Sequence, residues 1–204
     1  MEKTNKAFIQ LHLSVMLAGF TGLFGKLITL NEVDIVWYRM FFTSLILIVF
    51  TGLPKISLKK LAQLAMCGAL LGLHWMMFYG SIKASNVSIG VICYSLVGVF
   101  TAIFEPAILK RKFSWTEIAF SLITVLGLLC VFSFDSRYRY GILIGVGSAA
   151  ISSIYSIFNK KYSKGIKSRT VLFYEMSAGL VIVTAIIPIY TTIFNIHQDI
   201  QVIP

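Results

Sequence analysis

The sequence is poor in charged residues, which make up 13% of it, whereas about a quarter is usual in a soluble domain. It has only three cysteines, and each stands alone in an apolar run, so neither a disulfide framework nor a zinc site is indicated. No HExxH, GxSxG or glycine-rich phosphate loop is present. We therefore expect no soluble enzyme, no catalytic residue, no metal site and no cofactor.

Long apolar runs dominate the chain, and hydrophobic residues make up 57% of it. Crossing a bilayer takes about 20 mainly apolar residues in a helix. Seven stretches qualify, at about residues 8–30, 35–53, 61–81, 87–109, 115–134, 141–159 and 170–191. The connections between them are short. The sequence thus predicts an all-α, polytopic membrane helix bundle with seven transmembrane helices.

Basic residues outnumber acidic ones, and the net charge is +10. Most lysines and arginines gather in alternate connections between the apolar runs, at residues 3–6, 55–60, 110–112 and 160–169. This alternation is typical of cytoplasmic loops and predicts a multi-pass protein of the cytoplasmic (inner) membrane with its N-terminus in the cytoplasm. A basic surface for nucleic acid is not indicated, because the charges do not follow one exposed face.

Two parts of the chain resemble each other. Residues 17–26 (LAGFTGLFGK) and 151–160 (ISSIYSIFNK) keep small residues in step, and 36–40 aligns with 172–176 after a shift of two residues. Five predicted helices separate the two starts, so the second copy would enter the membrane inverted, as in many secondary transporters. We interpret residues 1–135 as a five-helix repeat and 136–204 as part of a second.

Local signals mark helix packing and helix starts. Gly68 and Gly72 in the third predicted helix would let a neighbouring helix approach closely. Ser114 and Glu117 form the pattern of a capping box, in which each side chain binds a free backbone amide at the start of the fifth predicted helix.

Ionisable side chains inside the predicted helices are candidates for a solute or proton pathway, because such groups are unfavourable in hydrocarbon without a partner or a cavity. The candidates are Lys26, Arg39, His74, Glu105 and Glu175. The repeat places Arg39 and Glu175 at equivalent positions. Six aromatic residues would line the same cavity or simply pack between helices: Trp37, Tyr38, Trp75, Tyr94, Tyr155 and Tyr174.

A structural role is the alternative for each candidate. Lys26 and Arg39 would extend outward to Glu32 and Asp34. His74 would be a hydrogen-bonded packing residue, although its titration range suits proton coupling.

The two acidic candidates have alternatives of their own. Glu105 precedes Pro106, which we expect to bend or loosen the helix there. Its alternative is an ion pair with the basic run at residues 110–112. For Glu175 the alternative partners are Lys160 and Lys161.

Several segments together resemble EamA-type permeases of the drug/metabolite transporter superfamily. They are the glycine-rich first helix ending in Lys26, the Trp37-Tyr38-Arg39 start of the second, the stretch from His74-Trp75 to Lys83, and residues 100–106 followed by a basic loop and Gly127. The resemblance implies ten helices in two inverted repeats, a central cavity, and transport of small metabolites, often coupled to protons.

The chain departs from the family pattern in two ways. Gly98 stands near the place of a common proline in the fourth helix, and residues 110–112 replace an acidic motif at its cytoplasmic end. The second repeat also lacks three helices, so we expect a truncated or partial sequence. We predict a secondary-active transporter of a small organic, amino-acid-like metabolite, coupled to protons by alternating access. The alternative is an intramembrane enzyme or a membrane scaffold.

Overall fold

The computed structural model describes residues 2–131 and 136–193, and these ranges contain helices and no strands. The elements are α1 (Glu2–Leu27), α2 (Glu32–Thr51), α3 (Leu58–Ala84), α4 (Val87–Ser95), α5 (Val97–Leu109), α6 (Trp115–Val131), the 3₁₀ turn η1 (Ser136–Tyr138), α7 (Arg139–Tyr162) and α8 (Ser168–Ile193). The all-α fold predicted from the sequence is confirmed.

Six spans in the described residues are long and apolar enough to cross a membrane. Five are single helices or parts of them, and the sixth is α4 and α5 together, Val87–Leu109. The apolar part of α6, Trp115–Gly127, is shorter than these. The fifth predicted stretch therefore forms a helix, and its last residues, 132–134, lie outside the described residues.

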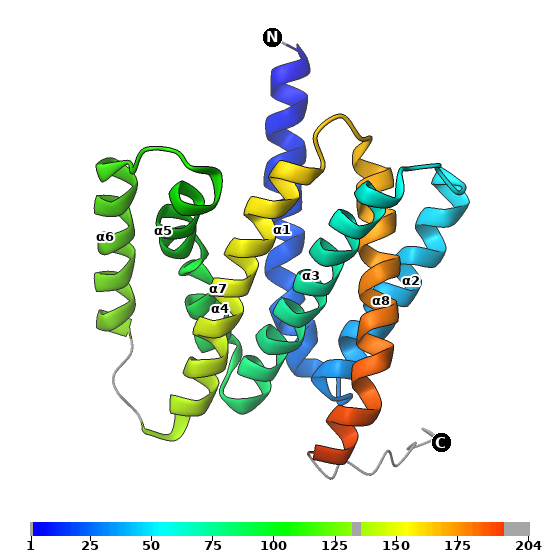
Figure 1. Ribbon diagram of the computed structural model, residues 1–204. Coiled ribbons are helices and arrows are strands. Elements are labelled where there is room, and N and C mark those ends of the chain that lie inside the picture. Colours follow the sequence, from blue (N-terminus) through cyan, green and yellow to red (C-terminus); the bar gives the residue numbers. More distant parts are fainter. Residues whose placement is uncertain (1, 132–135, 194–204) are drawn as a thin grey trace.

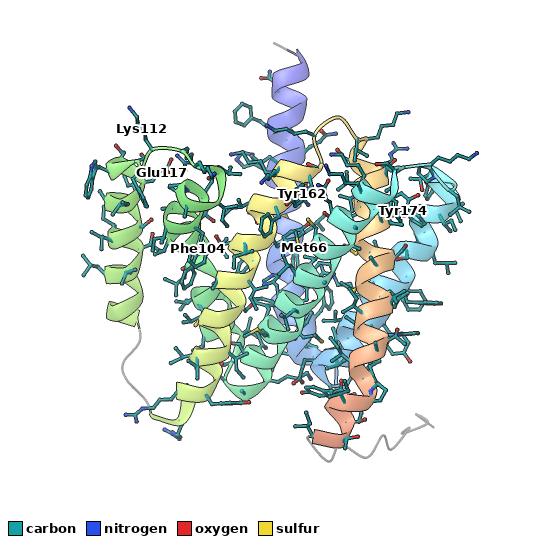
Figure 2. The ribbon with its side chains drawn as sticks, in the orientation of Figure 1. Met66, Phe104, Lys112, Glu117, Tyr162 and Tyr174 are labelled. Carbon is teal, nitrogen blue, oxygen red and sulfur yellow. The ribbon has the colours of Figure 1, made fainter. Side chains whose placement is uncertain are left out.

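The helices form a bundle in which α3 is central and packs against α7, α8 and α2 (Figure 1). The chain passes through α1 and α7 in opposite directions, and likewise through α2 and α8 (Figure 1). Helix α1 packs on α3 and α4, and its N-terminal end projects beyond the other helices. Figure 2 shows Lys112, Glu117 and Tyr162 toward the same end of the bundle.

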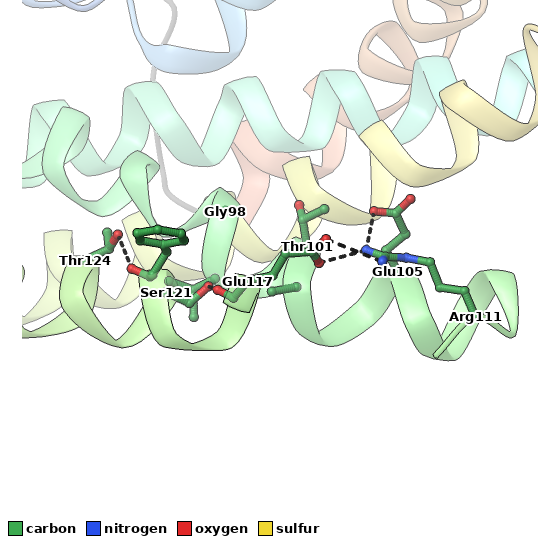
Figure 3. Close-up of a pocket in the computed structure, with 10 residues that line it drawn as sticks. Gly98, Thr101, Glu105, Arg111, Glu117, Ser121 and Thr124 are labelled. Carbon is green, nitrogen blue, oxygen red and sulfur yellow. Dashed lines mark hydrogen bonds and ion pairs between the residues drawn. The ribbon is translucent and has the colours of Figure 1, made fainter. Parts of the chain in front are cut away.

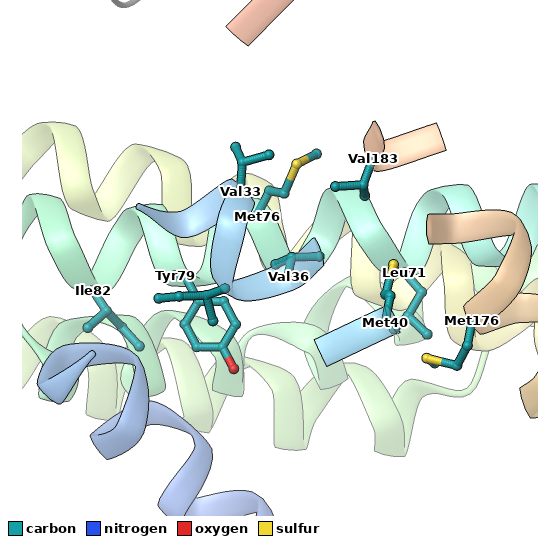
Figure 4. Packing of buried hydrophobic residues seen from close by; sticks show 10 residues of the cluster. Val33, Val36, Met40, Leu71, Met76, Tyr79, Ile82, Met176 and Val183 are labelled. Atoms are coloured by element: carbon teal, nitrogen blue, oxygen red, sulfur yellow. The ribbon is translucent and has the colours of Figure 1, made fainter. Parts of the chain in front are cut away.

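Apolar side chains of α2, α3 and α8 form the core (Figure 4). Val36 and Met40 from α2 lie against Leu71 and Met76 from α3 and against Val183 from α8. All five are less than a tenth exposed. This core holds α8 on the face of α3 beside α2, which fixes the position of the polar residues that the same helices carry.

The closest crossing in this region is made by Gly68, as its place in the third predicted helix suggested. A Cβ atom added to Gly68 would overlap the backbone carbonyl of Glu175. Gly179, one turn further along α8, lies against the carbonyl of Gly68 in the same way. The two glycines let the backbones of α3 and α8 approach each other, which buries Glu175.

The apolar span that carries Glu105 is divided into two helices. Helix α5 continues through Pro106 to Leu109, and the break lies at Leu96, between α4 and α5. The hydroxyl of Ser95 there donates to the carbonyl of Ile92 at 2.6 Å and competes with the helical backbone bond.

Candidate solute and ion site

Arg39 is fixed against two aromatic side chains of α3. Its Nη1 donates to the hydroxyl of Tyr79 at 3.0 Å, and its Cζ lies 3.8 Å from the ring centre of Trp75. These aromatic residues are one turn apart, so they meet the guanidinium together. The bond to Tyr79 uses one of the five N–H donors, which the guanidinium group holds in a rigid planar fork.

The alternative for Arg39, an extension toward the acidic residues at the start of α2, is not what the structure shows. Asp34 accepts a hydrogen bond from Asn31 at 2.6 Å, and Glu32 accepts one from the hydroxyl of Tyr190. Both acids are thus bonded at the end of the bundle, while Arg39 points toward α3. Lys26 lies exposed at the end of α1.

His74 is buried between α3 and α7 and is only 4% exposed. Its Nδ1 lies 2.9 Å from the Ser148 hydroxyl oxygen and 3.1 Å from the Ser148 carbonyl oxygen. Ser148 in turn donates to the carbonyl of His74 at 3.0 Å. The ring also stacks on Tyr94, with 5.3 Å between ring centres. These contacts lock α7 to α3, which is the packing role given above as the alternative for this histidine.

Glu105 is held between two cations. Lys160 of α7 donates to its Oε1 at 2.7 Å, and Arg111 from the α5–α6 connection donates to its Oε2 at 3.2 Å. Arg111 also donates to Glu117 at 2.9 Å, and the two carboxylates raise the pKa of the Arg111 guanidinium above its usual value (Figure 3). Glu105 and Arg111 line a pocket of about 420 Å³ between α5 and α6.

Only half of the predicted capping box is present at the start of α6. The Glu117 amide donates to the hydroxyl of Ser114 at 3.3 Å, as expected. The Glu117 carboxylate instead accepts from Arg111. The nearby guanidinium is a charged partner and makes the stronger hydrogen bond.

Glu175 is 1% exposed and is bonded in a different way. Its Oε2 accepts from the hydroxyl of Tyr155 at 3.1 Å and from the side-chain amide of Asn159 at 3.2 Å. Its Oε1 is buried and has no hydrogen-bond partner among the residues that the structure describes. The alternative partners are occupied elsewhere: Lys160 binds Glu105, and the Nζ of Lys161 lies 5.6 Å from the ring centre of Tyr162.

The aromatic candidates do not share one cavity wall. Trp75 supports Arg39 and Tyr94 supports His74, as described above. Trp37 donates from its indole nitrogen to the hydroxyl of Thr184 at 2.8 Å, and Tyr38 beside it is 46% exposed.

The other two aromatic candidates have separate contacts. Tyr174 donates to the carbonyl of Pro54. Tyr155 lies beside Glu175, and these two line a pocket of about 410 Å³ at the ends of α7 and α8.

Several residues of these contacts were not identified from the sequence. Asn159 follows Tyr155 by four positions, so both lie on one face of α7, and that spacing is the signal that would have found it. Ser148 gave no comparable signal, because it meets His74 through the packing of separate helices. Arg111, in contrast, belongs to the basic run 110–112 that was the expected alternative partner of Glu105. Within the described part of the chain, no three His, Cys, Asp or Glu side chains are grouped to hold a metal ion.

The comparisons with known proteins agree with this architecture. The family model of the EamA-like transporter family matches residues 5–133, which is more than half of the chain. The chain is also similar to the "Uncharacterized transporter YcxC" of Bacillus subtilis (strain 168), with 27% identity over 195 residues. That match covers 88% of this chain and 62% of the relative, so the chain spans less than two thirds of the relative's length. No solved structure matches the chain. The sequence, the membrane-spanning helices and the family match place this chain in the EamA-like transporter family.

Proposed function

We propose that the protein acts as a secondary-active transporter of a small organic, amino-acid-like solute, coupled to protons through alternating access. The observation that carries the proposal is a pair of opposite charges at equivalent positions of two apolar helices. Arg39 and Glu175 each lie seven residues after the first residue of α2 and α8, about 10 Å along the helix axis. Charged groups at such depth usually serve a solute or ion pathway.

The helix directions support a division into repeats at residues 1–135 and 136–204. The directions of α7 and α8 are opposite to those of α1 and α2 (Figure 1). A protein built from inverted repeats exposes its site to either side of the membrane when one repeat moves against the other. The proposed membrane is the cytoplasmic one, with the N-terminus inside, because the connections rich in lysine and arginine leave the bundle at the end where α1 begins.

The candidate residues take different parts in this proposal. Arg39 is the group that attracts a carboxylate of the solute, because its fork of donors is preorganised on Trp75. Glu175 is the group that exchanges protons, because no cation among the described residues is bonded to it. Lys26 adds positive charge at the outer end of α1, while Glu105 and His74 join helices through the partners described above.

Transport by the reconstituted protein tests the proposal. The protein is placed in proteoliposomes, and uptake of radiolabelled amino acids is measured with and without an imposed pH gradient. We expect gradient-dependent uptake that falls roughly tenfold or more in Arg39→Ala, the loss of about 1.4 kcal/mol of transition-state stabilisation. Glu175→Gln is expected to remove the dependence on the gradient.

Lys59→Gln is the matched control, since this lysine is exposed at the start of α3 and carries the same charge as Arg39. Uptake that is the same in the wild type, Arg39→Ala and Glu175→Gln would contradict the proposed roles. Chemical conversion of a lipid-linked substrate by the protein, without any solute flux, would favour the alternative of an intramembrane enzyme.

A further inference from the structure

The pocket beside Glu175 combines one acidic side chain with neutral polar ones. Asn159 and Tyr155 line it from α7, and Ser163 and Ser168 line it from the two helix ends that meet there. None of its lining residues is basic. We call this space the Glu175 pocket. Its walls are formed by two helices that are joined by a short connection.

The hydrogen bonds of Glu175 use only one of its two carboxylate oxygens. Oε2 has two donors, from Tyr155 and Asn159, whereas Oε1 is buried without any. Burying a carboxylate oxygen without a hydrogen-bond donor costs more free energy than burying a neutral polar group, because the carboxylate loses its hydration and nothing replaces it. The site thus lacks one cationic or N–H donor at a defined atom.

Three lysines near the pocket have other contacts. Lys160 forms its ion pair with Glu105 at 2.7 Å, and Lys60 donates from Nζ to the carbonyl oxygen of Tyr162 at 2.9 Å. The Nζ of Lys161 lies over the ring of Tyr162. These three residues therefore leave Oε1 of Glu175 without a donor.

We propose that the Glu175 pocket binds the protonated amine of a small organic solute, with the ammonium group on Oε1 of Glu175. The pocket of about 410 Å³ lies within the size range of sites for small organic ligands and is far larger than a bare ion needs. Val171 and Leu172 add apolar surface to the lining, which suits the carbon body of such a solute. The inference rests on the proposed function only in that a transported solute would reach this pocket.

Carbodiimide labelling of the purified full chain in detergent tests the amine site. Dicyclohexylcarbodiimide modifies carboxyl groups in apolar surroundings, and the adduct on the peptide that contains Glu175 is measured by mass spectrometry. We expect labelling that propylammonium chloride reduces several-fold, while propanol at the same concentration leaves it unchanged. Free propylamine can convert the activated carboxyl group into a propylamide with release of the urea, so the propylamide of Glu175 is measured in the same spectra and counted as labelled. Potassium chloride keeps the ionic strength equal in all samples.

Two variants and one competing cation complete the experiment. Glu175→Gln is expected to lose the adduct on this peptide, and Glu117→Gln, which removes an exposed carboxylate, is expected to keep both the adduct and its protection. Protection by sodium chloride equal to that by propylammonium would overturn the assignment of an amine. The absence of protection by any cation would overturn the site itself.

The labelling result is independent of transport. Protection by propylammonium in a protein that moves no solute would contradict the proposed function and leave the amine site standing. Uptake of solute by a protein whose labelling no amine reduces would contradict the amine site alone.

Discussion

Glu105 and Glu175 are acidic side chains on apolar helices, and both lie near the end of the bundle where the basic connections gather. Glu105 binds one cation at each carboxylate oxygen, Lys160 at Oε1 and Arg111 at Oε2. Glu175 has two neutral donors on one oxygen and none on the other. The pair at Glu105 joins α5 to α7, whereas Glu175 keeps an acceptor free beside a pocket. The same residue type in similar helices is thus suited to two roles: Glu105 joins two helices, and Glu175 offers a free acceptor to a ligand.

Charge reversal at Glu105 should give the largest effect on stability. Glu105→Lys would place a third cation beside Lys160 and Arg111, so the attraction between α5 and α7 becomes repulsion. We expect the largest fall in melting temperature of the three changes described here, measured on the purified protein in detergent. In the double variant Glu105→Lys/Lys160→Glu the pair is restored with its charges exchanged, and most of the stability should return.

Glu117→Gln is the control for this swap, because it removes a carboxylate from Arg111 at an exposed position. Its melting temperature should stay close to that of the wild type, since exposed ion pairs contribute little. A double variant no more stable than Glu105→Lys would show that the bond between α5 and α7 does not hold the bundle.

A methyl group at Gly68 should give the next largest effect, this time on the Glu175 side of the comparison. In Gly68→Ala the new Cβ meets the backbone carbonyl of Glu175, so α3 and α8 must separate. Overpacking of this kind costs about 1–3 kcal/mol, and we expect a lower melting temperature together with faster carbodiimide labelling of Glu175. The labelling should rise because the separated helices leave the carboxyl group more accessible.

Gly19→Ala is the matched control for Gly68→Ala, since it makes the same change in a helix at a position where nothing lies within 4 Å. Its stability should not fall. Equal stability of Gly68→Ala and Gly19→Ala would mean that the crossing of α3 and α8 is looser than the structure has it.

The fold was largely predictable because crossing a membrane requires long apolar helices, and those are visible as hydrophobic runs. The predicted stretch 35–53, for example, corresponds to α2, Glu32–Thr51. The break at Leu96 was not predicted, because it depends on the hydroxyl of Ser95 bonding within its own helix. A proline is a visible signal in a sequence, whereas a serine that competes for a backbone carbonyl is not.

The candidate side chains could be named from the sequence, but only some of their partners could, such as the basic run 110–112 that supplies Arg111 to Glu105. The depth of Glu105 and Glu175 in apolar runs identified both as unusual. Which of them Lys160 would reach depends on how α7 is rotated, and Glu105 lies on another helix, 55 positions away in the sequence. Helix rotation follows from packing against neighbours such as α3, which the hydrophobic pattern of a nearly uniform apolar helix does not fix.

Removal of one hydroxyl beside Glu175 should give the smallest of the three effects. Tyr155→Phe takes away one of the two donors to Oε2 and leaves Asn159 at 3.2 Å. A single hydrogen bond of this kind contributes about 0.5–1.5 kcal/mol, so we expect a modest fall in melting temperature. Tyr162→Phe is the control on the same helix, because its ring stacks on Phe158 and the change keeps that contact. If Tyr155→Phe were no less stable than Tyr162→Phe, the hydroxyl of Tyr155 would not be holding Glu175. Since the described residues bind this carboxylate at Oε2 alone, whereas Glu105 is bound at both oxygens, the orientation of Glu175 should be the more sensitive to the loss of one partner.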